Sequence, residues 1–176
     1  MHSHARLTPS TVARRAISAG RPRPSGFVIE LAPTRLTGQS AVVMVEVSES
    51  AEGWDFPFAG MGVAQLVIDY RLSLRLGGGV EIIIESPFSV RGVDGSITAI
   101  TPTEVSQLAG ALSLLHQIVK SASATTAGCL RVEFHDGSEV VADSDENYES
   151  WQVTFPDGPM YGAIPGEGVF VFPARS

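Results

Sequence analysis

Cysteine and lysine are almost absent from this chain of 176 residues, which contains Cys129 and Lys120 and no other residue of either type. A single cysteine excludes an intramolecular disulfide and a cysteine-based zinc cluster, and it is compatible with a reducing, cytoplasmic location. Cys129 opens an alternating apolar run, so we expect a buried, inert thiol. No apolar run approaches the roughly 20 residues that a membrane-spanning helix needs, so no membrane partner is predicted.

Sequence motifs for cofactor binding and catalysis are also lacking. Gly60-Met61-Gly62 has no preceding strand and no third glycine, and Gly77-Gly78-Gly79 leads into no helix, so neither run predicts a nucleotide site. His135 lies on the polar side of a predicted strand, and no pattern of nucleophile and base surrounds it or His116. We therefore predict no catalytic residue, no cofactor and no metal.

Charge divides the chain into two parts. Residues 1–43 carry six arginines and one acid, for a net charge of +5, whereas residues 44–176 carry six basic and 18 acidic residues, for −12. We predict a flexible basic segment over residues 1–55 and a single β-rich domain over residues 56–174. A second interpretation of the division is that translation begins at Met44. A domain this acidic repels nucleic acid, and its complement is a basic protein partner.

Alternating apolar residues predict a mainly β (α+β) fold. When the chain is aligned with itself without gaps, the hairpin around residues 72–84 falls on the hairpin around residues 130–142, and a further strand is expected before each hairpin. The simplest interpretation is two duplicated three-stranded antiparallel β units, followed by hairpin strands at the C-terminal end. Thr101 and Glu104 have the spacing of a capping box, which predicts one helix over residues 102–116.

The segment from Asp143 to Trp151 is the most distinctive local sequence. Its acids begin like a calcium-binding loop, but Tyr148 replaces the turn glycine, so a solvated loop is expected instead. Tyr148 and Trp151 could form an interface hot spot, or Trp151 could anchor the core while the Tyr148 hydroxyl reaches water. For a binding role, the candidate contact residues are Asp143, Asp145, Glu146, Tyr148, Glu149 and Trp151.

Several motifs together resemble a family of short uncharacterised proteins common in actinobacteria, over about residues 56–172. The motifs are the run from Tyr70 to Leu76, Glu85-Ser86-Pro87-Phe88, Asp136-Gly137, the YEAW-like Tyr148-Glu149-Ser150-Trp151, and Pro165-Gly166. The chain departs from the family pattern at Glu167, where a second turn glycine is usual, and at Phe172, where a tryptophan is usual. The resemblance implies a domain without a known activity and carries no residue roles; some relatives resemble immunity proteins of toxin systems.

Three hypotheses about function remain open. The first is a non-enzymatic protein-binding domain, of an immunity or regulatory type, that meets a basic partner through complementary charge. The second is a small-ligand-binding protein or hydrolase with a cavity between the two β units, lined by Tyr70, Phe88 and Trp151. The third is a structural component of a larger assembly.

Overall fold

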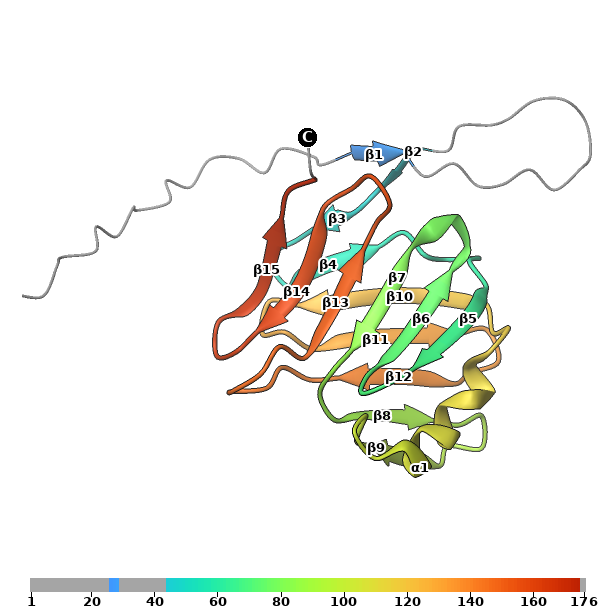
Figure 1. Cartoon of the computed structure of the whole chain (residues 1–176). Coiled ribbons are helices and arrows are strands. Elements are labelled where there is room, and N and C mark those ends of the chain that lie inside the picture. The colour runs from blue at the N-terminus through green and yellow to red at the C-terminus, as the bar shows by residue number, and fades with distance from the viewer. Residues whose placement is uncertain (1–25, 29–43, 175–176) are drawn as a thin grey trace, which may run out of the picture.

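The computed structural model describes residues 26–28 and 44–174. The chain forms two antiparallel sheets that pack face to face, with the strands of one sheet crossing those of the other (Figure 1). The prediction of a mainly β fold is therefore confirmed. A short pair, β1 (Gly26–Val28) with β2 (Met44–Glu46), lies outside the two sheets.

The first sheet has seven strands in the order β3-β4-β10-β11-β12-β8-β9. Their bounds are β3 Ser48–Glu49, β4 Gly53–Phe56, β8 Phe88–Arg91, β9 Ile97–Ile100, β10 Val119–Thr125, β11 Leu130–Phe134 and β12 Glu139–Ala142. The second sheet has six strands in the order β15-β14-β13-β7-β6-β5. Their bounds are β5 Val63–Ile68, β6 Leu72–Leu76, β7 Glu81–Ile84, β13 Trp151–Thr154, β14 Met160–Ile164 and β15 Gly168–Phe172. The three glycines after β6 form a short 3₁₀ turn, η1 (Gly77–Gly79), in which the last two have φ angles of 72° and 77°.

The predicted duplication is present, and its two units lie in opposite sheets. In the gapless self-alignment that places Leu72 on Leu130, β6 and β7 fall on β11 and β12 with matching bounds. The two strands that follow each unit also recur. When the offset of the self-alignment is lengthened, β8 falls on β13 and the start of β9 falls on the start of β14. Each of these later strands crosses to the other sheet: β8 pairs with β12, and β13 pairs with β7. The two repeats thus exchange strands, and neither sheet is built from one repeat alone.

The core lies between the two sheets. In the β units it is lined by the alternate residues that sequence periodicity assigns to the apolar face, such as Leu130, Val132 and Phe134, all at most 1% exposed. Aromatic rings bridge the layers, since Phe56 of the first sheet meets Tyr161 of the second edge-on, with their ring centroids 5.3 Å apart.

The structure corrects the predicted helix. Only α1 (Val105–Leu108) is α-helical, and η2 (Ala109–Leu114) continues it as a 3₁₀ helix. The expected capping box does not form, because the Thr101 amide donates to the Gln107 side chain (2.8 Å) instead of to Glu104. Glu104 has non-helical backbone angles (φ −96°, ψ 85°), so the first turn starts at Val105 rather than at residue 102.

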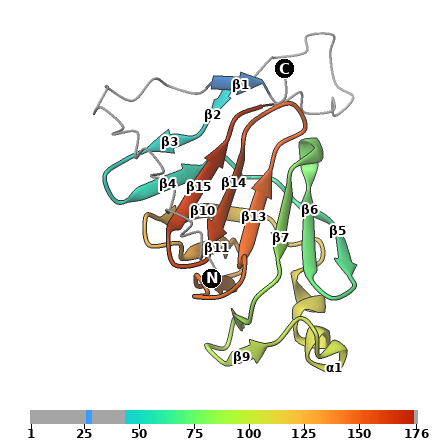
Figure 2. The same ribbon diagram turned by 60° about the vertical axis from the view of Figure 1, so that its left-hand side comes forward.

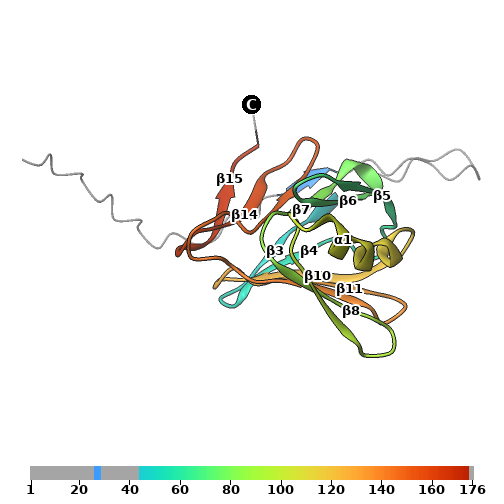
Figure 3. The same cartoon turned by 60° about the horizontal axis from the view of Figure 1, so that its bottom comes forward.

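The tighter 3₁₀ winding changes which face of this segment is buried. The buried side chains are Leu108, Ala111 and Leu114, spaced by three residues, as three residues per turn requires. Val105 and Leu112, which α-helical spacing would place on the apolar face, are 67% and 55% exposed. The segment closes one end of the sandwich (Figure 3). No helix of the described residues is both long and apolar enough to span a membrane.

Several strands escape the sequence analysis. These are β8, β9 and the four strands β1 to β4, which begin before the predicted domain start at residue 56; β3 and β4 join the first sheet through β10. Most of the predicted flexible segment, residues 1–25 and 29–43, lies outside the described residues. The side chain of Val47, 6% exposed, already belongs to the core.

We expect Leu114→Ala to lower the free energy of unfolding by about 2–5 kcal/mol, because it leaves a cavity at a fully buried site. Leu112→Ala, two residues earlier, should change it by less than about 0.5 kcal/mol. Urea unfolding of both variants measures the difference. If Leu112→Ala lowered the free energy of unfolding more than Leu114→Ala, Leu112 would have to be buried, as the α-helical spacing predicts.

Trp151 offers a second test of the packing. Its side chain is fully buried and its Nε1–H donates to the Gly128 carbonyl oxygen (2.8 Å). We expect Trp151→Phe to cost about 2–4 kcal/mol, since it removes buried volume and leaves that carbonyl unpaired. Tyr148→Phe is the matched control at an exposed ring and should cost less than about 0.5 kcal/mol. Equal costs in urea unfolding would contradict a core role for Trp151.

Candidate functional site

The loop of residues 143–149 is here called the acidic loop. It belongs to one of the two connections that lead from one sheet to the other, and this connection is the longer of the two. In the first repeat, three residues (85–87) connect β7 to β8 across the sandwich. In the second repeat, eight residues (143–150) connect β12 to β13 at the equivalent crossing. The fold therefore needs only the shorter connection. The second connection is five residues longer, and its first five residues, Asp143-Ser144-Asp145-Glu146-Asn147, contain three of the acids predicted as contact residues.

Hydrogen bonds fix the shape of the acidic loop. The Ser150 hydroxyl, fully buried, accepts from the Asp145 amide (2.6 Å). The Asp145 carboxylate accepts from the amides of Asn147 (2.7 Å) and Tyr148 (3.1 Å), as in an Asx turn. The Ser144 hydroxyl donates to the Ala127 carbonyl oxygen (3.0 Å), which fastens the loop to the β10–β11 turn. The loop is thus pre-organised rather than free.

The six predicted contact residues divide by exposure. Asp143, Glu146, Tyr148 and Glu149 are exposed, and the Tyr148 side chain is 72% exposed. Asp145 is half-buried and its carboxylate supports the turn. For Trp151 the structure corrects the prediction of a contact residue. Its side chain is buried in the core and leaves no surface that a partner could contact.

A second acidic turn lies beside the acidic loop. The Thr126 amide donates to the carbonyl oxygen of exposed Glu52 (3.0 Å), so the β3–β4 turn meets the same β10–β11 turn that Ser144 contacts. We call the three turns, residues 50–52, 126–129 and 143–149, the acidic end; they contain no basic residue. Sequence analysis missed Glu52 because it lies far before Asp143 in the chain. The sequence does not reveal the five-residue difference between the connectors, because this comparison needs β8, which the sequence analysis does not predict.

The acids of the acidic end lack counter-charges within the fold. No described residue forms an ion pair with Glu52, Asp143, Glu146 or Glu149; the Glu149 carboxylate accepts a hydrogen bond from the Gln152 side chain (3.1 Å). Among the described residues, no group of three or more metal-ligating side chains converges here or elsewhere. The arrangement therefore presents uncompensated negative charge around an exposed aromatic ring, which suits contact with a cationic surface.

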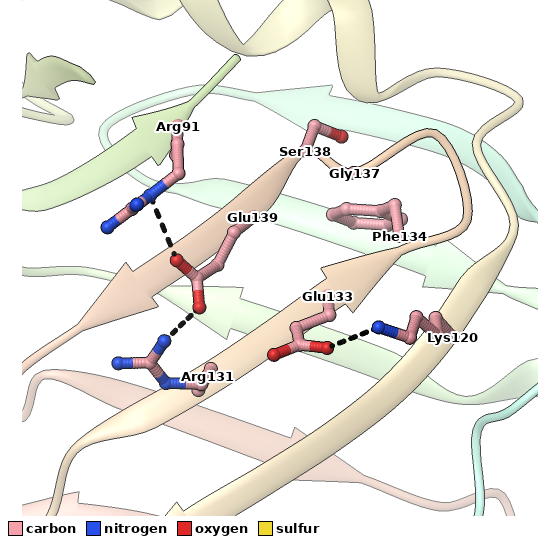
Figure 4. A pocket seen from close by; sticks show the side chains of 8 residues that line it. All are labelled: Arg91, Lys120, Arg131, Glu133, Phe134, Gly137, Ser138 and Glu139. Carbon is pink, nitrogen blue, oxygen red and sulfur yellow. Dashed lines mark hydrogen bonds and ion pairs between the residues drawn. The ribbon is translucent and has the colours of Figure 1, made fainter. Parts of the chain in front are cut away.

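A second candidate, the charged ladder, crosses the outer face of the seven-stranded sheet beside a depression of about 310 Å³ (Figure 4). Glu139, on β12, is buried and accepts from Arg91 of β8 (3.3 Å) and from Arg131 of β11. Glu133 of β11 pairs with Lys120 of β10 (3.2 Å). Hydrogen bonds from Lys120 and then from Ser121 lower the pKa of Glu133.

The ladder is compensated within itself. Each of its three cations already has a carboxylate partner, so an incoming anion would have to displace Glu133 or Glu139. The nearby Ser138 hydroxyl donates to Asp136 (2.6 Å), which closes the hairpin turn instead of activating a nucleophile. The ladder ties four neighbouring strands together, and we assign it a stabilising role.

The residues proposed for a cavity between the β units do not converge. Phe88 and Trp151 are packed in the core at 4% and 0% exposure, whereas Tyr70 lies on an exposed turn at 63%. Side chains of the two units fill the space between them. No depression described here is lined by any of these three residues.

Cys129 lies at the acidic end as a half-buried free thiol. Burial raises its pKa to about 11, and the nearby Asp143 carboxylate, which accepts from the thiol, acts in the same direction. A thiol with this pKa is almost entirely protonated at neutral pH and is a weak nucleophile. This agrees with the inert thiol that the sequence predicts, although the side chain is half-buried rather than fully buried.

We expect Cys129 in the folded protein to react with an aromatic disulfide roughly 100-fold more slowly at pH 8 than in the urea-unfolded chain, whose thiol has a pKa near 8.5. The folded-state rate should rise about tenfold per pH unit toward pH 11, where the thiolate forms. Absorbance of the released thiol gives both rates. A rate that levels off near pH 8.5 would contradict the raised pKa.

Comparison with known proteins identifies a family but no activity. No curated protein and no solved structure matches the chain. A family model described as a family of unknown function (DUF6188) matches residues 54–173, which include both β units, the acidic loop and β15. The chain therefore belongs to DUF6188, a family of unknown function.

Proposed function

We propose that the domain is a non-enzymatic protein-binding module, of an immunity or regulatory type, and that its acidic end contacts a basic surface of the partner. The observation that carries the proposal is the five-residue extension at residues 143–147. The equivalent crossing in the first repeat is made with three residues, so a crossing of this kind does not require the extension.

The form of the acidic loop supports a binding role. Its backbone is fixed by Ser150 and by the Asp145 carboxylate, so little conformational entropy would be lost on binding. Tyr148 projects from this turn as a large amphipathic ring, a residue type enriched among interface hot spots. The surrounding acids would accelerate association with a cationic partner and give the interaction a strong salt dependence.

The proposal extends to the setting of the protein. We place it in the cytoplasm, where its single half-buried thiol would stay reduced. The charge of −12 over residues 44–176 favours a basic protein over nucleic acid as the partner.

The proposal is tested with the full chain as bait in a lysate of its source cells. The loop variant Asp143→Asn/Glu146→Gln/Glu149→Gln keeps the side-chain shapes and the Asp145 turn but removes three charges. Combined with Tyr148→Ala, it should weaken binding of a stoichiometric basic partner at least tenfold, or about 1.4 kcal/mol. Quantitative mass spectrometry identifies the partner, and titration with the purified partner measures the loss.

The matched control removes charge elsewhere. Glu104→Gln/Asp157→Asn neutralises two exposed acids outside the acidic end and should leave the affinity within about twofold. Equal weakening by both sets would mean that only net charge matters. A partner that binds the loop variant as well as the unmodified chain, or the capture of no partner, would refute the proposal.

A further inference from the structure

β15 is an edge strand and has, within the described residues, none of the usual protection against pairing. It runs Gly168-Val169-Phe170-Val171-Phe172, without a charge, a bulge or an internal proline, and it is the outermost strand of its sheet (Figure 2). Among the described residues it pairs only with β14. Phe170, Val171 and Phe172 are 44%, 39% and 42% exposed. Natural edge strands of this kind are normally blunted unless they pair with another strand.

The hydrogen bonds of β14 show which way its main-chain groups point. The Ser150 amide, just before β13, donates to the Ala163 carbonyl oxygen (3.2 Å), so Ala163 directs its main-chain groups toward β13. Because these groups alternate along a strand, the neighbouring residues Gly162 and Ile164 direct theirs toward β15. The Ile164 carbonyl oxygen confirms this direction, since it accepts from the Glu167 amide in the turn that leads into β15 (3.3 Å).

The same alternation identifies the free groups of β15. Gly162 is opposite Phe170, and Ile164 is opposite Gly168. Those two β15 residues therefore bond to β14. Val169 and Val171 are left with their N–H and C=O groups directed outward at the open edge.

These outward groups fit a second copy of the same strand. In an antiparallel two-fold pairing centred on Phe170, Val169 lies opposite Val171 of the second copy, so both outward-facing residues meet in hydrogen-bonded pairs. Centring the pairing on Val171 instead would place Pro173, which has no N–H, opposite Val169. The main chain therefore favours the register centred on Phe170.

The side chains fit this register as well. The rings of Phe170 and Phe172 lie on one face of β15, with their centroids 4.5 Å apart. In the pairing centred on Phe170, the two Phe170 rings are neighbours across the two-fold axis, and each Phe172 lies opposite Gly168 of the second copy. The ring of Phe172 can thus cover a position without a side chain. Gly168 cannot be replaced freely, since a Cβ there would lie 2.3 Å from the Thr126 carbonyl oxygen.

The opposite face of the strand extends the core. Val169 and Val171 are paired with Ala163 and Tyr161 of β14, whose side chains are buried between the sheets. Val169 packs partly against the core, whereas Val171 remains 39% exposed beside the open edge. A second β15 would bring its own Val169 against this Val171 and cover it.

We propose that the protein forms a two-fold symmetric dimer in which β15 of each copy pairs antiparallel with β15 of the other, centred on Phe170. The six-stranded sheets of the two copies join into one continuous sheet. The four rings of Phe170 and Phe172 form one cluster on its outer face.

Light scattering coupled to size-exclusion chromatography of the full chain tests the proposal. The unmodified protein should be a dimer. Val171→Pro removes one outward N–H and places a ring at the open edge, so this variant should be monomeric. Val171→Thr keeps the N–H and the β-branched shape and should remain dimeric. Thermal unfolding followed by circular dichroism confirms that both variants are folded.

Disulfide cross-linking tests the register without changing the main chain. In a Cys129→Ala background, Phe170→Cys places two thiols opposite each other on the two-fold axis, where the Cα atoms of such a pair lie about 4.5 Å apart, within reach of a disulfide. Phe172→Cys is the matched control, because its two thiols would be four positions apart along the strands, or about 13 Å. Phe170→Cys should cross-link at least tenfold faster under mild oxidation, measured on non-reducing gels.

Three results would overturn the proposal. The first is a monomeric unmodified protein. The second is a dimer that Val171→Pro leaves intact. The third is cross-linking of Phe172→Cys as fast as that of Phe170→Cys, which would show that the strands do not pair in this register.

Discussion

Ser150 occupies the point at which the second repeat crosses from one sheet to the other, and much of the structure depends on its three polar groups. Its carbonyl oxygen accepts from the amides of Glu85 (2.8 Å) and Ser86 (3.2 Å), at the equivalent crossing of the first repeat. Its amide donates to Ala163, and its hydroxyl accepts from Asp145. Since the residue is fully buried, each of these groups would be costly to leave unpaired. One residue thus joins the two crossings, leads into β13 and fixes the acidic loop.

The exchange of strands also explains how charge is arranged on the surface. The charged ladder lies on central strands of the first sheet. There each carboxylate forms an ion pair with a cation. The acidic end lies on turns, where chain length can vary without disturbing the core. Its turns come from both halves of the chain, Glu52 before the first repeat and residues 143–149 within the second. Assembly of the sandwich therefore also assembles this surface.

Much of the β architecture can be predicted from the sequence, because alternation marks each buried face. β6, β7, β11 and β12 follow from the apolar alternation of Leu72-Ser73-Leu74-Arg75-Leu76 and its recurrence at residues 130–134. The exchange of strands between the repeats could not be predicted, because apolar periodicity does not show which strands pair with each other. In addition, the sequence offset between the repeats becomes longer at the acidic loop, so one gapless alignment does not cover both. β8 does alternate, with Phe88 and Val90 buried, but Pro87 directly before it is typical of the end of a strand rather than of a new one. The predicted helix begins too early because the capping-box pattern does not reveal that the Thr101 amide donates to the Gln107 side chain. Among the site residues, Asp143, Glu146, Tyr148 and Glu149 are exposed, as their polar side chains predict, whereas the apolar ring of Trp151 fits a core as well as an interface.

Separating the two repeats tests most directly whether they exchange strands. The chain can be cut in the connection between β9 and α1, between exposed residues 103 and 104, to give fragments 1–103 and 104–176. In each fragment, strands that pair across the repeats lose their partners, β8 from β12 and β13 from β7. We expect amide NMR spectra of the separate fragments to show unfolded chains, and the spectrum of an equimolar mixture to regain the dispersion of the intact protein. A separate fragment with a dispersed, cooperative fold of its own would show that a repeat is self-sufficient and would contradict the exchanged sandwich.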